Sequence, residues 1–249
     1  MTPTSPAPAP SPSPTLGKLK IFADGASLPA LQELAGNPRI AGFTTNPTLM
    51  RKAGVKDYRG FAREVLQHIT DKPISFEVFA DEFAEMNRQA REIATWGQNV
   101  YVKIPITNTR RESAAALVKS LSADGVKLNV TALCTVTQVR ETAQALKGGA
   151  PSVISVFAGR IADTGRDPIP LMAESLQLCR QADARIELLW ASPRELLNIV
   201  QAADVGCDII TVTPDLLKKL ELLGKDLADF SLDTVKMFHQ DAQDAGYQL

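Results

Sequence analysis

The stretch NVYVKIP, Asn99 to Pro105, has the composition of a short buried strand, except that Lys103 stands inside it. Side chains alternate between the two faces of a strand, so Lys103 shares one face with Tyr101. The other face carries only apolar side chains, those of Val100, Val102 and Ile104. A charged amine is costly to bury unless it is paired or loses its proton. Lys103 therefore needs a partner or a chemical role.

Seven further β-rich runs occur along the chain: LKIFA, RIAGFT, PISFEVF, VKLNVTA, SVISVF, RIELLWA and DIITVT. Together with NVYVKIP they make eight predicted strands, and a longer helix-like stretch follows each of them. Such alternation indicates parallel strands joined by crossover helices. Eight units in 249 residues favour an α/β fold of the (β/α)8, or TIM barrel, type. A doubly wound sheet is the alternative, but GxGxxG and GxxxxGK[ST] motifs are absent from the expected places. The segment SLDTVKMFHQDAQDAG predicts an extra C-terminal helix.

The first residues, MTPTSPAPAPSPSPTLG, alternate proline with small residues. This composition favours an extended chain and cannot bury a core, so residues 1–17 are predicted to form a disordered tail. A docking segment for a partner is the alternative. The tail lacks the basic start and apolar core of a secretory signal peptide. Residues 18–249 are predicted to form one domain, the (β/α)8 barrel.

Composition excludes several partners. The chain is 45% hydrophobic and 22% charged, and its formal net charge of −1 gives no reason to expect nucleic acid or a membrane surface. No apolar run approaches the roughly 20 residues that span a bilayer. The odd, widely spaced cysteines Cys134, Cys179 and Cys207 suggest buried thiols in a reducing compartment, and hence a cytoplasmic protein.

The sequence contains little that could hold a metal. His68 and His239 are the only histidines, and both occur in amphipathic helix-like stretches away from the predicted strand ends. No HxxxH or CxxC spacing is present. We therefore expect no metal and no cofactor.

Polar residues are concentrated near the C-terminal ends of separate predicted strands, where TIM barrels build their active sites. Alternation turns Lys103, Glu77, Asn129, Thr131 and Ser155 inward, together with Phe157. The first strand ends in Asp24, the second in TTNP and the seventh in ASPR. Two alternatives are a layer of polar side chains that satisfy one another and a one-residue slip that reverses the faces.

These side chains suit carbonyl chemistry. A neutral lysine amine attacks a carbonyl to form a Schiff base, and the protonated imine then draws electrons from the neighbouring carbon, which allows a C–C bond to break or form. Asp24 and Glu77 are the available acid/base groups, and Asn46 and Asn129 can hold hydroxyls. Arg160 and Arg194 suit a phosphate. Alternatively, Lys103 binds a phosphate or pairs with Glu77 without reacting.

Several motifs, in order, carry a family resemblance that covers residues from about Leu19 to Leu249. GFTTNPTLM resembles a GxTTNPS segment, YVKIP a VVKIP strand, LNVTALCT an NVTLIFS strand, SVFAGRI an SPFVGRI segment and WASPRE an AASxR loop. The chain resembles transaldolases of the short type grouped with fructose-6-phosphate aldolases.

The resemblance implies roles for particular residues. Lys103 would form the Schiff base, and Asp24 would be the acid/base in C–C cleavage. Glu77 and Thr131 would position a catalytic water. Asn46, Asn129 and Ser155 would hold the dihydroxyacetone unit of the substrate. Arg160, Ser192 and Arg194 would form the phosphate site, and Phe157 and Thr44 are two further residues expected to bind substrate.

Three features favour group transfer over simple aldol cleavage. Simple aldolases of the group carry Gln at the position of Glu77 and Tyr at that of Phe157, and they lack a pair like Asn129 and Thr131.

The sequence also departs from the family pattern in FADGAS, in FAGRIAD and in ITNTRRES, and the last of these adds Arg110 and Arg111 near the expected mouth of the barrel. We expect those arginines to influence the choice of acceptor.

The resemblance therefore implies a transaldolase that takes a dihydroxyacetone unit from fructose 6-phosphate or sedoheptulose 7-phosphate and gives it to an aldose phosphate. The usual setting is the pentose phosphate pathway, although a specialised sugar pathway would need the same residues. A simple aldolase is the nearest alternative, and a non-catalytic sugar-phosphate-binding protein is a more distant one. The expected partners are sugar phosphates, with a homo-oligomer as a further expectation.

Overall fold

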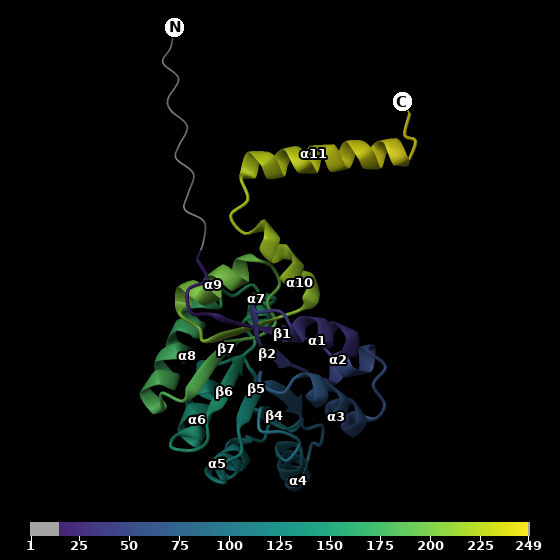
Figure 1. Cartoon of the computed structure of the whole chain (residues 1–249). Helices are drawn as coiled ribbons and strands as arrows, with labels where there is room; N and C mark the ends of the chain where they lie inside the picture. The colour runs from purple at the N-terminus through teal and green to yellow at the C-terminus, as the bar shows by residue number, and fades with distance from the viewer. Residues whose placement is uncertain (1–14, 249) are drawn as a thin grey trace.

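The computed structural model describes residues 15–248, and it contains a closed barrel of parallel strands surrounded by helices (Figure 1). The strands pair in chain order, and β1 closes the barrel by pairing with β8. They are β1 Lys20–Asp24, β2 Ile40–Thr44, β3 Ile74–Glu77, β4 Val100–Pro105, β5 Leu128–Leu133, β6 Ser152–Val156, β7 Ile186–Trp190 and β8 Ile209–Val212. The predicted (β/α)8 barrel is confirmed. Residues 1–14 of the predicted tail lie outside the described residues.

Helices follow the strands around the barrel. In chain order they are α1 Leu28–Ala35, α2 Pro47–Lys52, α3 Tyr58–His68, α4 Phe83–Ala94, α5 Ala115–Ala123, α6 Val136–Leu146, α7 Ala158–Ala162, α8 Ile169–Ala182, α9 Leu197–Val205, α10 Pro214–Lys218, the 3₁₀ helix η1 Lys219–Leu222 and α11 Leu227–Asp244. Several begin with a side-chain cap; Thr135, for example, forms a capping box with Gln138 at the start of α6. No helix in the described part of the chain is both long enough and apolar enough to cross a bilayer.

The predicted strand faces are confirmed. On β4, Val100, Val102 and Ile104 are buried in the large apolar core between strands and helices. Tyr101 instead packs against a small second cluster inside the barrel. Lys103 points to the same side and is 5% exposed.

The interior of the barrel is filled in layers, as is usual for this fold. At the amino-terminal end of the strands, Lys20 pairs with Glu187. Above them lies a small apolar cluster whose buried members are Phe22, Val153, Leu189, Ala191 and Ile209. Gly42 makes room for the Phe22 ring, because an added Cβ there would lie 2.5 Å from a ring carbon. This apolar layer therefore closes the lumen between the Lys20–Glu187 pair below and the polar side chains at the upper end.

A register shift alters β5 near its end. Val130 pairs with Ile154 and Leu133 pairs with Val156. Between these two pairs β5 contains one residue more than β6, which is a β-bulge. Ala132 lies in this bulge with φ of +66°, a conformation that costs a residue with a Cβ. The bulge brings both Thr131 and Ala132 to the cavity described below.

The predicted C-terminal helix is α11, which stands away from the barrel (Figure 1). None of its residues is buried, although it is amphipathic. Its large apolar side chains are between 45% and 82% exposed; they belong to Leu227, Phe230, Leu232, Val235, Met237 and Phe238.

Candidate active site

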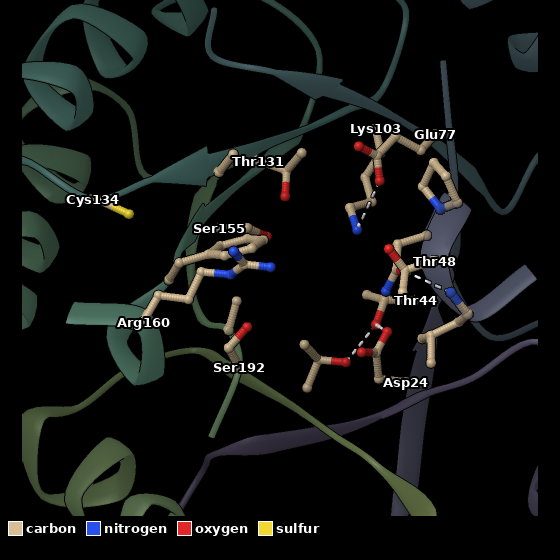
Figure 2. A pocket seen from close by; sticks show the side chains of 17 residues that line it. Asp24, Thr44, Thr48, Glu77, Lys103, Thr131, Cys134, Ser155, Arg160 and Ser192 are labelled. Carbon is tan, nitrogen blue, oxygen red and sulfur yellow. Dashed lines mark hydrogen bonds and ion pairs between the residues drawn. The ribbon is translucent and has the colours of Figure 1, made fainter. Parts of the chain in front are cut away.

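A cavity of about 560 Å³ opens at the C-terminal ends of the strands. All predicted site residues except Asn129 and Arg194 line it. Figure 2 shows Arg160 and Ser192 on one side of the cavity, facing Lys103, Glu77, Thr44 and Asp24 on the other. The lining residues are Asp24, Thr44, Asn46, Pro47, Thr48, Leu49, Glu77, Lys103, Thr131, Ala132, Cys134, Ser155, Phe157, Arg160, Ala191, Ser192 and Thr211.

Lys103 projects into this cavity from the middle of the barrel wall. Its Nζ donates a hydrogen bond of 2.9 Å to the carbonyl oxygen of Thr45 and lies 3.3 Å from Glu77 Oε2. Lys103 and Glu77 are directly opposite each other in the register of β3 and β4. The pairing expected for an unreactive lysine is thus present, and it also puts a carboxylate within proton-transfer range of the amine.

Asp24, at the end of β1, accepts a hydrogen bond of 2.7 Å from Thr44 Oγ1. Thr44 Oγ1 in turn lies 2.5 Å from Thr211 Oγ1 on β8. Burial raises the pKa of the Asp24 carboxyl, although the charge of Lys103 and the hydrogen bond from Thr44 both act to lower it. Asp24 is therefore better able to accept a proton than an exposed aspartate.

Thr131 lies on the cavity wall with a buried hydroxyl. Its Oγ1 has no hydrogen-bond partner among the described residues. Buried hydroxyls are normally satisfied, so this one is suited to a polar group of a ligand or to a water molecule. The side chains of Thr131, Glu77 and Lys103 line the same cavity.

Asn46 and Asn129 differ in position. Asn46 begins α2, and its Oδ1 accepts from the backbone N–H of Leu49 while its side chain lines the cavity. Asn129 is 1% exposed beneath the cavity, where its Nδ2 donates to Ser75 Oγ and its Oδ1 accepts from Ser155 Oγ. Part of the polar layer thus satisfies itself, which was the alternative interpretation of the sequence. A substrate contact by Asn129 stays a prediction.

The two arginines that were expected to bind a phosphate also differ in position. Arg160 lines the cavity, its guanidinium stands 5.4 Å from the centre of the Phe157 ring, and none of the ion pairs between described residues includes it. Arg194 instead forms a two-point ion pair with Asp163, with Nε 3.1 Å from Oδ1 and Nη2 bonded to Oδ2. Arg194 does not line the cavity.

The two arginines expected at the mouth do not line the cavity either. Arg110 is surrounded by carboxylates and pairs with Glu82, Glu112 and Asp81. Arg111 is exposed, with φ of +64°. An effect of Arg110 on the acceptor would have to compete with this network of ion pairs.

Several lining residues were missed at the level of sequence. Thr211 is a polar residue inside the apolar run IITV of β8, and this break in the pattern was the available signal. Cys134 was expected to be buried, like Cys179 and Cys207, but it is exposed at the cavity wall because it follows the last residue of β5. Among residues 15–248, no group of three or more His, Cys, Asp or Glu side chains could hold a metal ion.

Comparison with known proteins gives a consistent result. Residues 21–249 match the family model described as Transaldolase/Fructose-6-phosphate aldolase. A protein named "Probable transaldolase" from Dehalococcoides mccartyi is 34% identical over 218 residues, which cover 86% of this chain and 97% of the relative. A "Probable transaldolase" from Methanococcus maripaludis is 36% identical over 218 residues, with the same coverage of 86% and 97%.

A "Probable transaldolase" from a Thermoanaerobacter species is 32% identical over 231 residues and is covered completely. Among solved structures, the N-terminal domain of a putative aldolase from Bacteroides vulgatus matches with a TM-score of 0.50 at 16% identity, covering 79% of this chain and 73% of that one. That likeness concerns the fold alone.

Proposed function

Because this chain belongs to the transaldolase/fructose-6-phosphate aldolase family, we propose that it is a transaldolase that acts through a Schiff base on Lys103. It transfers a dihydroxyacetone unit from fructose 6-phosphate or sedoheptulose 7-phosphate to an aldose phosphate. The observation that carries the proposal is the position of Lys103 Nζ, buried in the cavity, 3.3 Å from the Glu77 carboxylate and close enough to Asp24 to influence its charge.

The first step is imine formation. The Lys103 amine attacks the C2 carbonyl of the ketose phosphate, and the resulting carbinolamine loses water to give a protonated imine. Glu77 is within proton-transfer range of the Lys103 nitrogen, and the free hydroxyl of Thr131 can hold the water that leaves. The same two side chains serve hydrolysis of the imine at the end of the cycle.

The second step is C–C cleavage. Asp24 takes the proton from the C4 hydroxyl, the C3–C4 bond breaks and its electrons move into the imine to form an enamine. The aldose phosphate leaves, and the three-carbon unit stays on Lys103. Addition of the enamine to the aldehyde of a second aldose phosphate reverses these movements, and the protonated Asp24 returns its proton to the new hydroxyl. Burial raises the pKa of Asp24, which suits a carboxyl group that alternates between its ionised and protonated forms during the cycle.

Substrate phosphate is best accommodated by Arg160 together with the Ser192 hydroxyl. Both line the cavity across from Lys103, and Arg160 keeps its guanidinium free of carboxylates among the described residues (Figure 2). Arg194 would contribute as a direct ligand only after it leaves Asp163. Asn46, Asn129, Ser155 and Thr44 remain the candidates for holding the hydroxyls of the dihydroxyacetone unit.

The simple aldolase is the second candidate function, and it uses the same lysine. Incubation with fructose 6-phosphate alone distinguishes the two activities. A transaldolase keeps the three-carbon unit on Lys103 until an acceptor arrives, whereas an aldolase releases free dihydroxyacetone at every turnover. We expect little free dihydroxyacetone without erythrose 4-phosphate and rapid sedoheptulose 7-phosphate formation with it.

Borohydride trapping tests the lysine directly. Reduction in the presence of fructose 6-phosphate is expected to fix a three-carbon adduct on Lys103, located by peptide mass analysis. Lys103→Met should abolish both adduct and activity. Lys72→Met is the matched control, because Lys72 is also partly buried, and its amine bonds, among the described residues, to the backbone oxygens of Ala35 and Asn37 alone. An adduct on another lysine, or an active Lys103→Met enzyme, would refute the mechanism.

Assembly and location form part of the proposal. The exposed apolar side of α11 supports a homo-oligomer in which this helix packs on a second copy of the chain. Light scattering should give a mass above that of one chain, and Val235→Glu/Phe238→Glu should lower it.

We place the enzyme in the cytoplasm, in carbohydrate metabolism by way of the pentose phosphate pathway. Its three unpaired cysteines agree with a reducing compartment.

A further inference from the structure

We propose that Thr211, on β8, is a positioning residue for the reaction: its hydroxyl donates to Thr44 and thereby commits the single proton of Thr44 to the Asp24 carboxylate. This inference rests on the proposed role of Asp24 as acid/base. Thr211 would act through Thr44, without needing to contact the reacting carbons.

The direction of the hydrogen bonds follows from counting protons. Thr44 Oγ1 lies 2.7 Å from Asp24 Oδ1 and 2.5 Å from Thr211 Oγ1. A carboxylate only accepts, so Thr44 must give its one proton to Asp24. The short contact between the two hydroxyls then requires Thr211 to be the donor. The chain of donation runs from Thr211 to Thr44 and ends at Asp24.

The surroundings allow few other arrangements. Thr44 is 2% exposed and Thr211 is 6% exposed, so water has little access to compete for either hydroxyl. The three side chains come from the adjoining strands β8, β1 and β2, which fix their spacing through the backbone ladder. Hydrogen bonds in such a buried series strengthen one another.

The consequence for Asp24 concerns both geometry and charge. Thr44 holds Oδ1, while Oδ2 accepts from none of the described residues and is left for a substrate hydroxyl. A hydrogen bond to the carboxylate favours its charged form, which is the form that must take the C4 proton. Loss of the Thr211 hydroxyl would free Thr44 to rotate, and Asp24 would hold its proton more tightly.

Other charged groups near Asp24 have to be considered. The flanking strands β2 and β8, with sequences IAGFT and IITV, contribute no titratable side chain. Across the cavity, Lys103 stabilises the carboxylate, and Glu77, Arg160 and Cys134 line the same space. A substitution of Thr211 alters none of these four residues. A change in the pKa of Asp24 in such a variant therefore reports on the Thr211–Thr44 hydrogen bond.

Thr211→Val removes the hydroxyl and keeps the shape of the side chain, whereas Thr211→Ser keeps the hydroxyl. The measurement is kcat against pH for transfer from fructose 6-phosphate to erythrose 4-phosphate. In Thr211→Val the acid limb is expected to move upward by about half a pH unit, the size expected for a weakened hydrogen bond. Thr211→Ser should keep the wild-type limb. An unmoved limb in Thr211→Val, or equal shifts in both variants, would overturn the proposal.

Thr142→Val is the matched control. Its buried hydroxyl bonds to the Gln138 carbonyl within α6, so this variant loses a buried threonine hydroxyl outside the site. It should leave the pH profile unchanged. Borohydride trapping is run on every variant, and Thr211→Val should still form the Lys103 adduct.

A direct titration separates this proposal from the proposed function. The carboxyl carbon of Asp24 is followed by ¹³C NMR against pH without substrate, in wild type and Thr211→Val, with Thr211→Ala as a second variant if the valine is not tolerated. A higher Asp24 midpoint in the variant supports the Thr211 link even where no Lys103 adduct forms, and an unchanged midpoint refutes it. Absence of the wild-type adduct refutes the Schiff-base function alone.

Discussion

Gly159 lies so close to Ser192 that an added Cβ would be 1.6 Å from the Ser192 carbonyl oxygen. The Gly159 N–H also donates to the carbonyl oxygen of Ala191, at 3.3 Å. The beginning of α7 is thereby held against the end of β7, and Ser192 takes a strained φ of +59° at this point. The contact lies next to Arg160 and includes Ser192, and both of these residues line the cavity.

Gly159→Ala should therefore push α7 away from β7. We expect the free energy of unfolding to fall by about 1–3 kcal/mol and KM for fructose 6-phosphate to rise. Thermal unfolding and steady-state kinetics measure the two effects. Gly36→Ala is the control, since its nearest atom would be 3.9 Å away, and it should change stability by no more than about 0.5 kcal/mol. Equal behaviour of the two variants would contradict the argument.

Arg160→Ala should weaken ketose phosphate binding far more than Arg194→Ala. Arg160 lines the cavity, whereas Arg194 is held by Asp163. Loss of a charge-assisted contact predicts a KM higher by roughly 10- to 100-fold for Arg160→Ala, and only a small change for Arg194→Ala. Unphosphorylated fructose serves as the control donor, because its KM should hardly change. The reverse order for the two arginines would assign the phosphate to Arg194.

Asp24→Asn is expected to lower kcat by roughly 10²- to 10⁴-fold and to stabilise the fold at neutral pH. Burial raises the pKa of Asp24, so wild type gains stability from this group at low pH and loses it as the pH rises through the folded-state pKa. The variant's advantage in Tm should therefore grow from acid to neutral pH. The exposed Asp204→Asn is the control, and a lower Tm for Asp24→Asn at neutral pH would reverse the sign.

Cys134 should be the one thiol that iodoacetamide modifies in the folded protein, because Cys179 and Cys207 are buried. Partial burial raises the pKa of the Cys134 thiol, although the nearby Arg160 acts to lower it. The thiolate is the reactive form, so the rate should climb as the pH rises beyond the ordinary range of a cysteine. Fructose 6-phosphate should protect. Cys134→Ser is the control, and labelling of that variant at the same rate would show that the reagent reaches another cysteine.

Gly42→Ala should destabilise the barrel by about 1–3 kcal/mol, since the new methyl would meet the Phe22 ring. Phe22→Leu in the same chain should recover part of the loss, because the leucine is shorter. Denaturant unfolding of the two single variants and the double variant gives the coupling. Additive losses would mean that the two residues do not compete for this space.

The sequence pattern was sufficient for the eight strands and for the faces of β3 to β6, because strict alternation fixes which side chains point inward. It did not predict the bulge at Ala132, since alternation assumes a regular register. It also missed the Arg194–Asp163 pair, which depends on where two loops meet in space. The face of β8 was not assigned, and Thr211 was overlooked for that reason.

The apolar layer around Phe22 has a kinetic consequence. Because the lumen is closed beneath the cavity, every reactant must pass through the same opening between the strand ends. In the proposed transfer reaction, the first aldose phosphate would have to depart before the second could enter, and donor and acceptor would compete for the free enzyme. Excess acceptor should therefore slow turnover by occupying the empty site, and double-reciprocal plots at several low acceptor concentrations should be parallel lines.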